Sequence, residues 1–170
     1  MEVLLMSKNL LNILIIVLLL ISFSFVIEAG NTATQNINIT VSTINEISLS
    51  NNEVNLMVNA PSSGSNLDKV SDSSTTISYS TNESNQKITA HLDEAMAFGL
   101  TLMVEVTSTA GNSTGQVMLE DEAAGAVDVV KDISNVSESG ETVIYTLIPD
   151  MYAQPMTKSY IVTYTITSAL

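Results

Sequence analysis

The stretch Leu100-Thr-Leu-Met-Val-Glu-Val106 decides the fold class of this chain. Leucine and valine occupy every second position, and Thr, Met and Glu stand between them. A period of two is typical of a strand that packs one face against a core and turns the other to solvent. Its β-branched residues suit such a half-covered pleated surface. The stretch therefore predicts a half-buried β-strand.

The same period recurs on both sides of this strand, so the chain is expected to be all-β. Residues 142–148 are apolar at both parities and predict a central strand. Short helical turns are expected only at 93–98 or 120–124, and Phe98 is expected to plug one end of the core. The remaining alternating segments are 37–41, 47–49, 54–58, 77–79, 88–92, 117–119, 127–129 and 160–166.

Turn-forming clusters separate these segments. Residues 61–66, 111–115 and 137–141 are rich in Gly, Ser, Asn or Pro, which favour tight turns. Eight to ten short strands divided in this way predict an antiparallel β-sandwich of the Ig-like, Greek-key type.

The first 29 residues differ from everything that follows. Lys8 precedes an apolar run, residues 10–27, and Ala29 offers a small residue for cleavage. This is the pattern of a signal peptide, although the run approaches the length of an uncleaved membrane anchor. In either case residues 1–29 form an N-terminal hydrophobic helix, and residues 30–170 form one domain outside the membrane, secreted or on the cell surface.

Charge and cysteine content limit the partners of the exported domain. Without Glu2, Glu28 and Lys8, the remaining 16 acids and four lysines give it a net charge of about −12. Binding to nucleic acid or anionic lipid needs clustered cations, so both are excluded as partners. Only residues 1–29, if they are not cleaved, are expected to contact a membrane. The chain has no cysteine, so burial alone must hold the domain together.

No catalytic, cofactor-binding or metal-binding set emerges from the residue types, and the chain is expected not to be an enzyme. His91 is the only histidine and occupies a polar position of its strand. Tyr160 and Tyr164 share the parity of Val162, which favours a place in the core over a sugar-binding platform. The acidic pairs and clusters are interpreted as solvated loops, with Ca²⁺ as the alternative: Asp68 with Asp72, Asp93 with Glu94, residues 120–122, and Asp128 with Asp132.

Four Asn-x-Ser/Thr sequons begin at Asn38, Asn82, Asn112 and Asn135. Their number is what the Asn, Ser and Thr content gives by chance, but an exported, exposed chain permits glycosylation there.

The stretch that begins at Gln35 has the character of a donor strand. Ile37, Ile39 and Val41 alternate with Asn38 and Thr40 after a polar start. An extended segment of this kind can add to a sheet of a neighbouring subunit through main-chain hydrogen bonds and alternate side-chain pockets. An ordinary first strand paired inside its own domain is the favoured interpretation of this stretch, and donor-strand exchange is the alternative.

Four segments resemble uncharacterised secreted β-sandwich proteins of bacteria and archaea: Thr40-Val-Ser-Thr-Ile-Asn-Glu-Ile47, Ser71-Asp-Ser-Ser-Thr-Thr76, Lys87-Ile-Thr-Ala90 and Val162-Thr-Tyr-Thr-Ile166. The resemblance implies export and a sandwich fold, and it implies no site residues. We therefore expect a non-catalytic structural protein of the cell exterior that forms homo-oligomers by N-terminal strand exchange or joins other surface components. The alternative is an extracellular binding or adhesion module for a glycan, Ca²⁺ or a protein ligand.

Overall fold

The computed structural model describes residues 30–62 and 65–169. The expected leader, residues 1–29, lies outside them. Val41–Leu170 form one compact unit, and the residues before Val41 belong to another. Within the described residues, no helix is long and apolar enough to span a bilayer.

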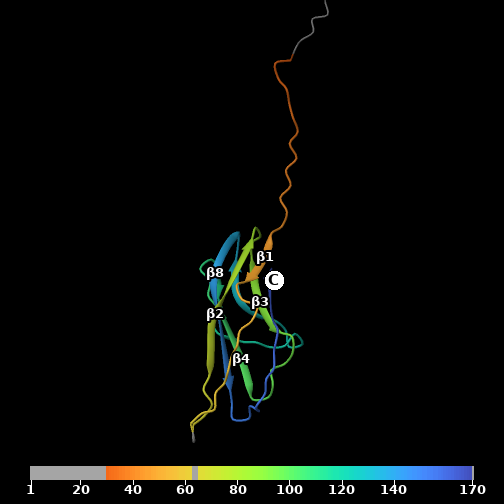
Figure 1. Cartoon of the computed structure of the whole chain (residues 1–170). Helices are drawn as coiled ribbons and strands as arrows, with labels where there is room; N and C mark the ends of the chain where they lie inside the picture. Colours follow the sequence, from red (N-terminus) through yellow and green to blue (C-terminus); the bar gives the residue numbers. More distant parts are fainter. Residues whose placement is uncertain (1–29, 63–64, 170) are drawn as a thin grey trace, which may run out of the picture. The chain divides into compact units, whose positions relative to one another are not determined.

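The expectation of an all-β chain is confirmed. Two antiparallel sheets, consistent with a β-sandwich, contain the nine strands, and the described residues form no helix (Figure 1). One sheet has the order β1-β2-β8-β4-β6, and the other has the order β5-β7-β3-β9. The strands are β1 (Asn45–Leu49), β2 (Val70–Thr81), β3 (Gln86–Leu92), β4 (Leu100–Val106), β5 (Asn112–Ser113), β6 (Val117–Met118), β7 (Val127–Ile133), β8 (Val136–Pro149) and β9 (Val162–Ser168).

The central strand predicted at 142–148 is confirmed within β8. β8 lies in the middle of the five-stranded sheet and pairs with β2 on one side and β4 on the other. Leu100 to Val106, paired with Pro149 to Val143, buries Leu102, Val104 and Val106 in the expected alternation. Burial on one face therefore follows the period of two in β4.

The turn predicted at 137–141 is wrong, because β8 runs through it. Ile77 pairs with Glu141 and Tyr79 pairs with Glu138, so two residues of β8, Ser139 and Gly140, stand opposite Ser78. Gly140 has a φ of +77°, which a residue without a Cβ adopts at little cost. The glycine thus makes a β-bulge that keeps the strand in its sheet.

Two predicted strands, 37–41 and 54–58, are absent from the structure. In the second of them the alternation itself is present, since Val54, Leu56 and Val58 are half-buried and their neighbours exposed. A strand also needs a backbone partner, and alternation alone does not supply one. The predicted helical turns at 93–98 and 120–124 are likewise plain loops with single turns.

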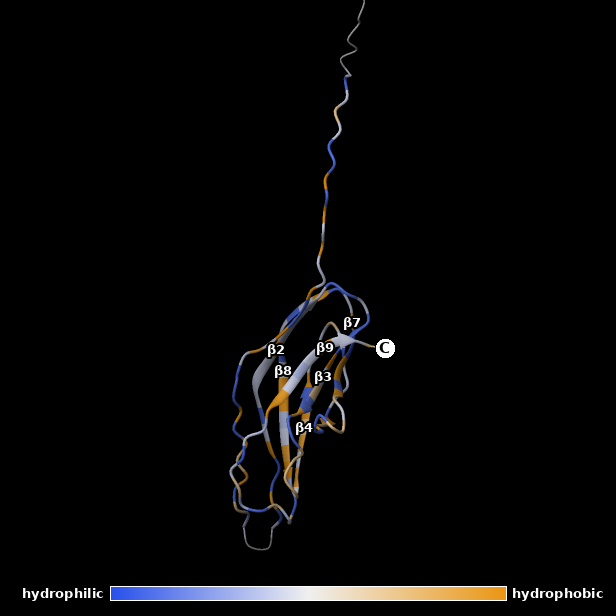
Figure 2. Cartoon of the chain, turned by 90° about the vertical axis from the view of Figure 1, so that its right-hand side faces the viewer, coloured by the Kyte–Doolittle hydropathy of each residue, from blue (hydrophilic) through white to orange (hydrophobic). Residues whose placement is uncertain are grey.

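The core is aliphatic and lies between the sheets. Both sheets contribute fully buried residues, among them Ile77 and Val104 from one and Ile88 and Val129 from the other. Figure 2 shows apolar residues recurring along β3, β4 and β8. Phe98 was expected to close one end, but its side chain is 80% exposed, so that prediction is wrong. Close packing of Ile, Val and Leu fills the interior without it.

The hydroxyl of Thr75 on β2 is buried and has no hydrogen-bond partner within the described residues. Because a buried, unpaired hydroxyl keeps its desolvation cost, Thr75→Val should raise the free energy of unfolding by about 1 kcal/mol. Thr146→Val is the matched control, since its buried hydroxyl bonds to Ser71 at 3.0 Å and Gln116 at 3.2 Å and its loss should destabilise. Urea unfolding measures both variants, and a Thr75→Val variant less stable than the parent contradicts the prediction.

Candidate functional site

The N-terminal segment, residues 35–41, presents its apolar residues to solvent. The side chains of Ile37 and Ile39 are 76% and 82% exposed, and Val41 is similarly exposed. No strand is assigned anywhere from residue 30 to residue 44. Exposed large aliphatic side chains in strict alternation are unusual, because a strand normally buries them on one face.

A second extended stretch, residues 51–60, is called the side segment. It leaves the end of β1 and passes down the side of the domain beside β2 (Figures 1 and 2), with the Asn51 side-chain amide donating to the Ser74 carbonyl at 2.9 Å. Val54, Leu56 and Val58 pack against the core. Within the described part of the chain, the side segment makes no backbone–backbone hydrogen bond. It therefore occupies a strand position through its side chains alone.

Two sheet edges lack a strand neighbour among the described residues, and one of them, on β2, lies next to the side segment. β1 pairs with β2 only as far as Leu49 and Ile77, with one further bond from the Ser50 N–H to the Thr76 carbonyl at 2.9 Å. In the described chain, the edge of β2 from Val70 to Thr75 has no strand on that side, and β9 has a strand neighbour only in β3. Because β1 and β9 lie close together, both open edges are on one side of the domain.

A buried carboxylate, Glu138 of β8, organises the loop after β4. Its side chain is 9% exposed and accepts hydrogen bonds from Tyr79 and Ser108, from the Thr109 backbone at 2.6 Å and hydroxyl, and from the Ala110 backbone at 2.9 Å. Burial alone would raise the pKa of Glu138, but the bonds from Thr109, Tyr79 and Ser108 outweigh it and lower the pKa to about 2. The Glu138 carboxylate is therefore ionised at neutral pH, and its oxygens accept hydrogen bonds from β2 and from the loop after β4.

Three tyrosine side chains make contacts in the core or with a loop. Burial raises the pKa of Tyr145 and Tyr164, and the Tyr164 hydroxyl donates to the Tyr145 hydroxyl at 2.8 Å across the two sheets. The Tyr160 hydroxyl accepts from the Ala97 backbone at 3.0 Å. Tyr145 is buried in the core, and Tyr160 and Tyr164 pack against it as expected, with Tyr160 also bonded to the loop after β3.

The acidic clusters separate into local contacts. Asp72 accepts from Ser74, Asp121 from the Ala124 backbone, and Glu94 pairs with Lys158 at 2.7 Å. Lys87 lies 2.8 Å from Asp128 and lowers its pKa. Among the described residues, no three His, Asp or Glu side chains come together in a group that could hold a metal ion.

Of the four sequon asparagines, Asn82 and Asn135 lie close together, each next to one of the paired residues Thr81 and Val136. His91 is half-buried on β3 opposite Thr163. Asn38, Asn82, Asn112 and Asn135 are all exposed. The amide of Asn82 is already engaged, accepting from the Ile44 backbone at 2.9 Å and donating to the Ser42 carbonyl at 2.8 Å. The glycosylation of these asparagines stays a prediction.

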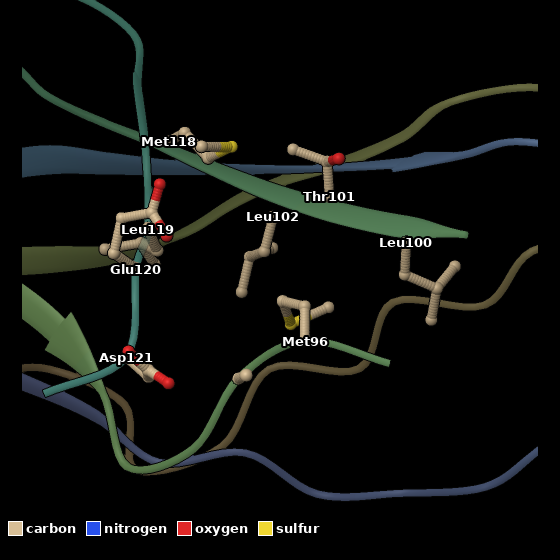
Figure 3. Close-up of a pocket in the computed structure, with 9 residues that line it drawn as sticks. Met96, Leu100, Thr101, Leu102, Met118, Leu119, Glu120 and Asp121 are labelled. Atoms are coloured by element: carbon tan, nitrogen blue, oxygen red, sulfur yellow. The ribbon is translucent and has the colours of Figure 1, made fainter. Parts of the chain in front are cut away.

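A cavity of about 250 Å³ opens beside β4, where residues 117–121 change sheets. β6 pairs with β4, and Asp121 then bridges to Leu92 of β3. Figure 3 shows Met96 and Leu102 facing each other across the space, with Glu120 and Asp121 on the crossing segment. The volume of this cavity lies below the roughly 300 Å³ at which small-molecule sites begin, so the cavity does not favour a small-molecule ligand.

The loops before β4 and after β8 form an apolar surface, called the loop platform, that comprises Phe98, Met151 and Tyr152. All three side chains are exposed, and the Phe98 and Tyr152 rings lie 5.8 Å apart. The Asp150 N–H donates to the Gly99 carbonyl at 2.8 Å and joins the two loops. Sequence reasoning missed this surface, because the residues come from separate loops.

Comparison of the chain with protein-family models, with curated proteins and with solved structures finds no match in any of the three.

Proposed function

We propose that this chain is a non-catalytic structural protein of the cell exterior, an Ig-like, Greek-key β-sandwich that assembles with copies of itself through its N-terminal segment. The observation that carries the proposal is the exposed alternation of Ile37, Ile39 and Val41 in a segment without a strand of its own. Export rests on the leader pattern of residues 1–29.

Charge also favours the N-terminal segment as the contacting part. Two copies of the domain, each with about 12 negative charges, repel each other at close range. Residues 29–45 contain no charged side chain. An uncharged strand can therefore approach an acidic neighbour at little electrostatic cost and contribute main-chain hydrogen bonds and apolar contacts.

The test compares the protein from residue 30 onward with a variant carrying Ile37→Asp and Ile39→Asp. Light scattering at rising concentration should show oligomers of the parent and only monomers of the variant, because two buried charges oppose strand addition. Asn36→Asp with Asn38→Asp is the matched control, since it adds the same charge and keeps the apolar residues. A parent that stays strictly monomeric at high concentration contradicts the proposal.

The loop platform favours a second candidate, an extracellular binding module. Aromatic and Met side chains held on bonded loops are typical of interaction surfaces. Under this candidate the protein is monomeric, and a glycan or a protein ligand that contacts the loop platform raises its Tm. A Phe98→Ser variant that keeps the Tm increase contradicts the platform as the binding surface.

A further inference from the structure

We propose that the acceptor for the N-terminal segment is the groove that the side segment fills, on a second copy of this chain. The inference rests on the proposed function and specifies its site. In assembly, Ile37, Ile39 and Val41 of one copy replace Val54, Leu56 and Val58 of the next.

The two segments have the same pattern. Ile37-Asn-Ile-Thr-Val-Ser42 and Val54-Asn-Leu-Met-Val-Asn59 both place aliphatic residues at the first, third and fifth positions and a polar residue at the second and sixth. Alternate side chains of a strand point to the same face. A groove that accepts the second sequence therefore has three apolar positions at the spacing of the first.

The side segment and the N-terminal segment of a second copy differ in the backbone hydrogen bonds that each can form in the groove. Within the described residues, the side segment makes no backbone–backbone bond, and the neighbouring edge from Val70 to Thr75 has no strand partner there. Side chains occupy one point of this edge, since the Ser74 N–H donates to Asp72 and the Ser74 carbonyl accepts from Asn51, and an incoming segment must displace the Asn51 bond. A segment that lies straight along this edge forms ladder bonds that the resident lacks. The side segment and the N-terminal segment of a second copy bury similar apolar side chains, so the additional backbone bonds favour the N-terminal segment.

Chain length makes the acceptor a second copy. Ile39 precedes Asn45, the first residue of β1, by six residues, and Leu56 follows it by eleven. Six residues span at most ~22 Å, whereas the eleven residues from Asn45 to Leu56 span up to roughly 36 Å. The N-terminal segment of one chain is therefore too short to lie in the groove beyond its own β1.

The absence of cysteine from the chain allows a direct test by thiol labelling. Leu56→Cys is introduced into the Ile37→Asp/Ile39→Asp protein, and a synthetic peptide of residues 35–43 serves as the donor. Displacement of the side segment should raise the rate of maleimide labelling at position 56 by about tenfold. Met57→Cys is the control, because Met57 is 73% exposed and its labelling should be fast with or without peptide.

The outcomes separate the two proposals. If the peptide does not bind and the parent does not oligomerise, self-assembly itself fails. If the peptide binds, labelling at position 56 is unchanged and the amides of Val162–Ser168 become protected from exchange, the acceptor is the open edge of β9 and the groove is wrong. Labelling at position 56 as fast as at position 57 before peptide is added also overturns the inference, and Val58→Cys provides a second reporter.

Discussion

Glu138→Gln is expected to lower the free energy of unfolding by about 3 kcal/mol at pH 7, because it removes the charge that five donors stabilise. The folded-state pKa is about 2, against an ordinary value of 4.5. A lowered pKa means that the fold favours the ionised form. Its contribution is complete above about pH 4.5 and disappears as pH falls toward 2. Urea unfolding from pH 2 to pH 7 measures the difference between parent and variant.

Glu141→Gln is the matched control for this prediction. It lies on the same strand, and its carboxylate accepts a single side-chain bond, from the Thr107 hydroxyl at 2.9 Å. One such bond contributes about 1 kcal/mol, so the control should lose much less stability. Equal losses in the two variants, or a Glu138→Gln loss that persists undiminished at pH 2, would show that the carboxylate network is not the cause.

Gly99→Ala is expected to destabilise the domain by about 3 kcal/mol, through left-handed backbone strain together with a backbone clash. Gly99 has a φ of +83°, and an added Cβ would lie against the Ala153 nitrogen and 2.7 Å from the Tyr152 carbonyl carbon. Relief requires the two loops to separate, and the bond from Asp150 to the Gly99 carbonyl opposes this. Thermal unfolding followed by circular dichroism measures the decrease in Tm.

The control is Gly115→Ala, which isolates backbone strain. Gly115 has a φ of +74°, and nothing lies within 4 Å of the position of its Cβ. This variant should lose only about 1 kcal/mol. If both substitutions lower the Tm equally, the close approach of the loops at Gly99 does not contribute to the loss of stability in Gly99→Ala. Gly99→Ala should also disturb the loop platform, which changes in tyrosine fluorescence would report.

Local pattern was sufficient for the strands of the interior. The alternation at 100–106 and the doubly apolar stretch 142–148 predict β4 and the core of β8, because solvent sorts side chains with the period of the backbone itself. The same rule identified the places of Tyr160 and Tyr164 against the core. It failed for 137–141, where Gly140 permits either a turn or a bulge and only the neighbouring strand decides between them.

The network around Glu138 was not predictable from the sequence. Its donors come from β2 and from the loop after β4, 28 to 59 residues away along the chain. The exposure of Phe98 also depends on the third dimension, since its loop folds against the loop after β8. An apolar residue type predicts burial, but elements distant in sequence decide whether the core has space for its side chain.

Composition and period were enough to predict an all-β domain after residue 30 with an acidic surface and no disulfide, because both act on every residue locally. The tertiary structure alone decided which alternating segments become strands. Residues 45–49 gain a ladder on β2, whereas residues 54–58 pack against the core without one. The reason is physical: side-chain burial follows from the residue's own chemistry, but a backbone hydrogen bond requires a second edge at the right distance and direction.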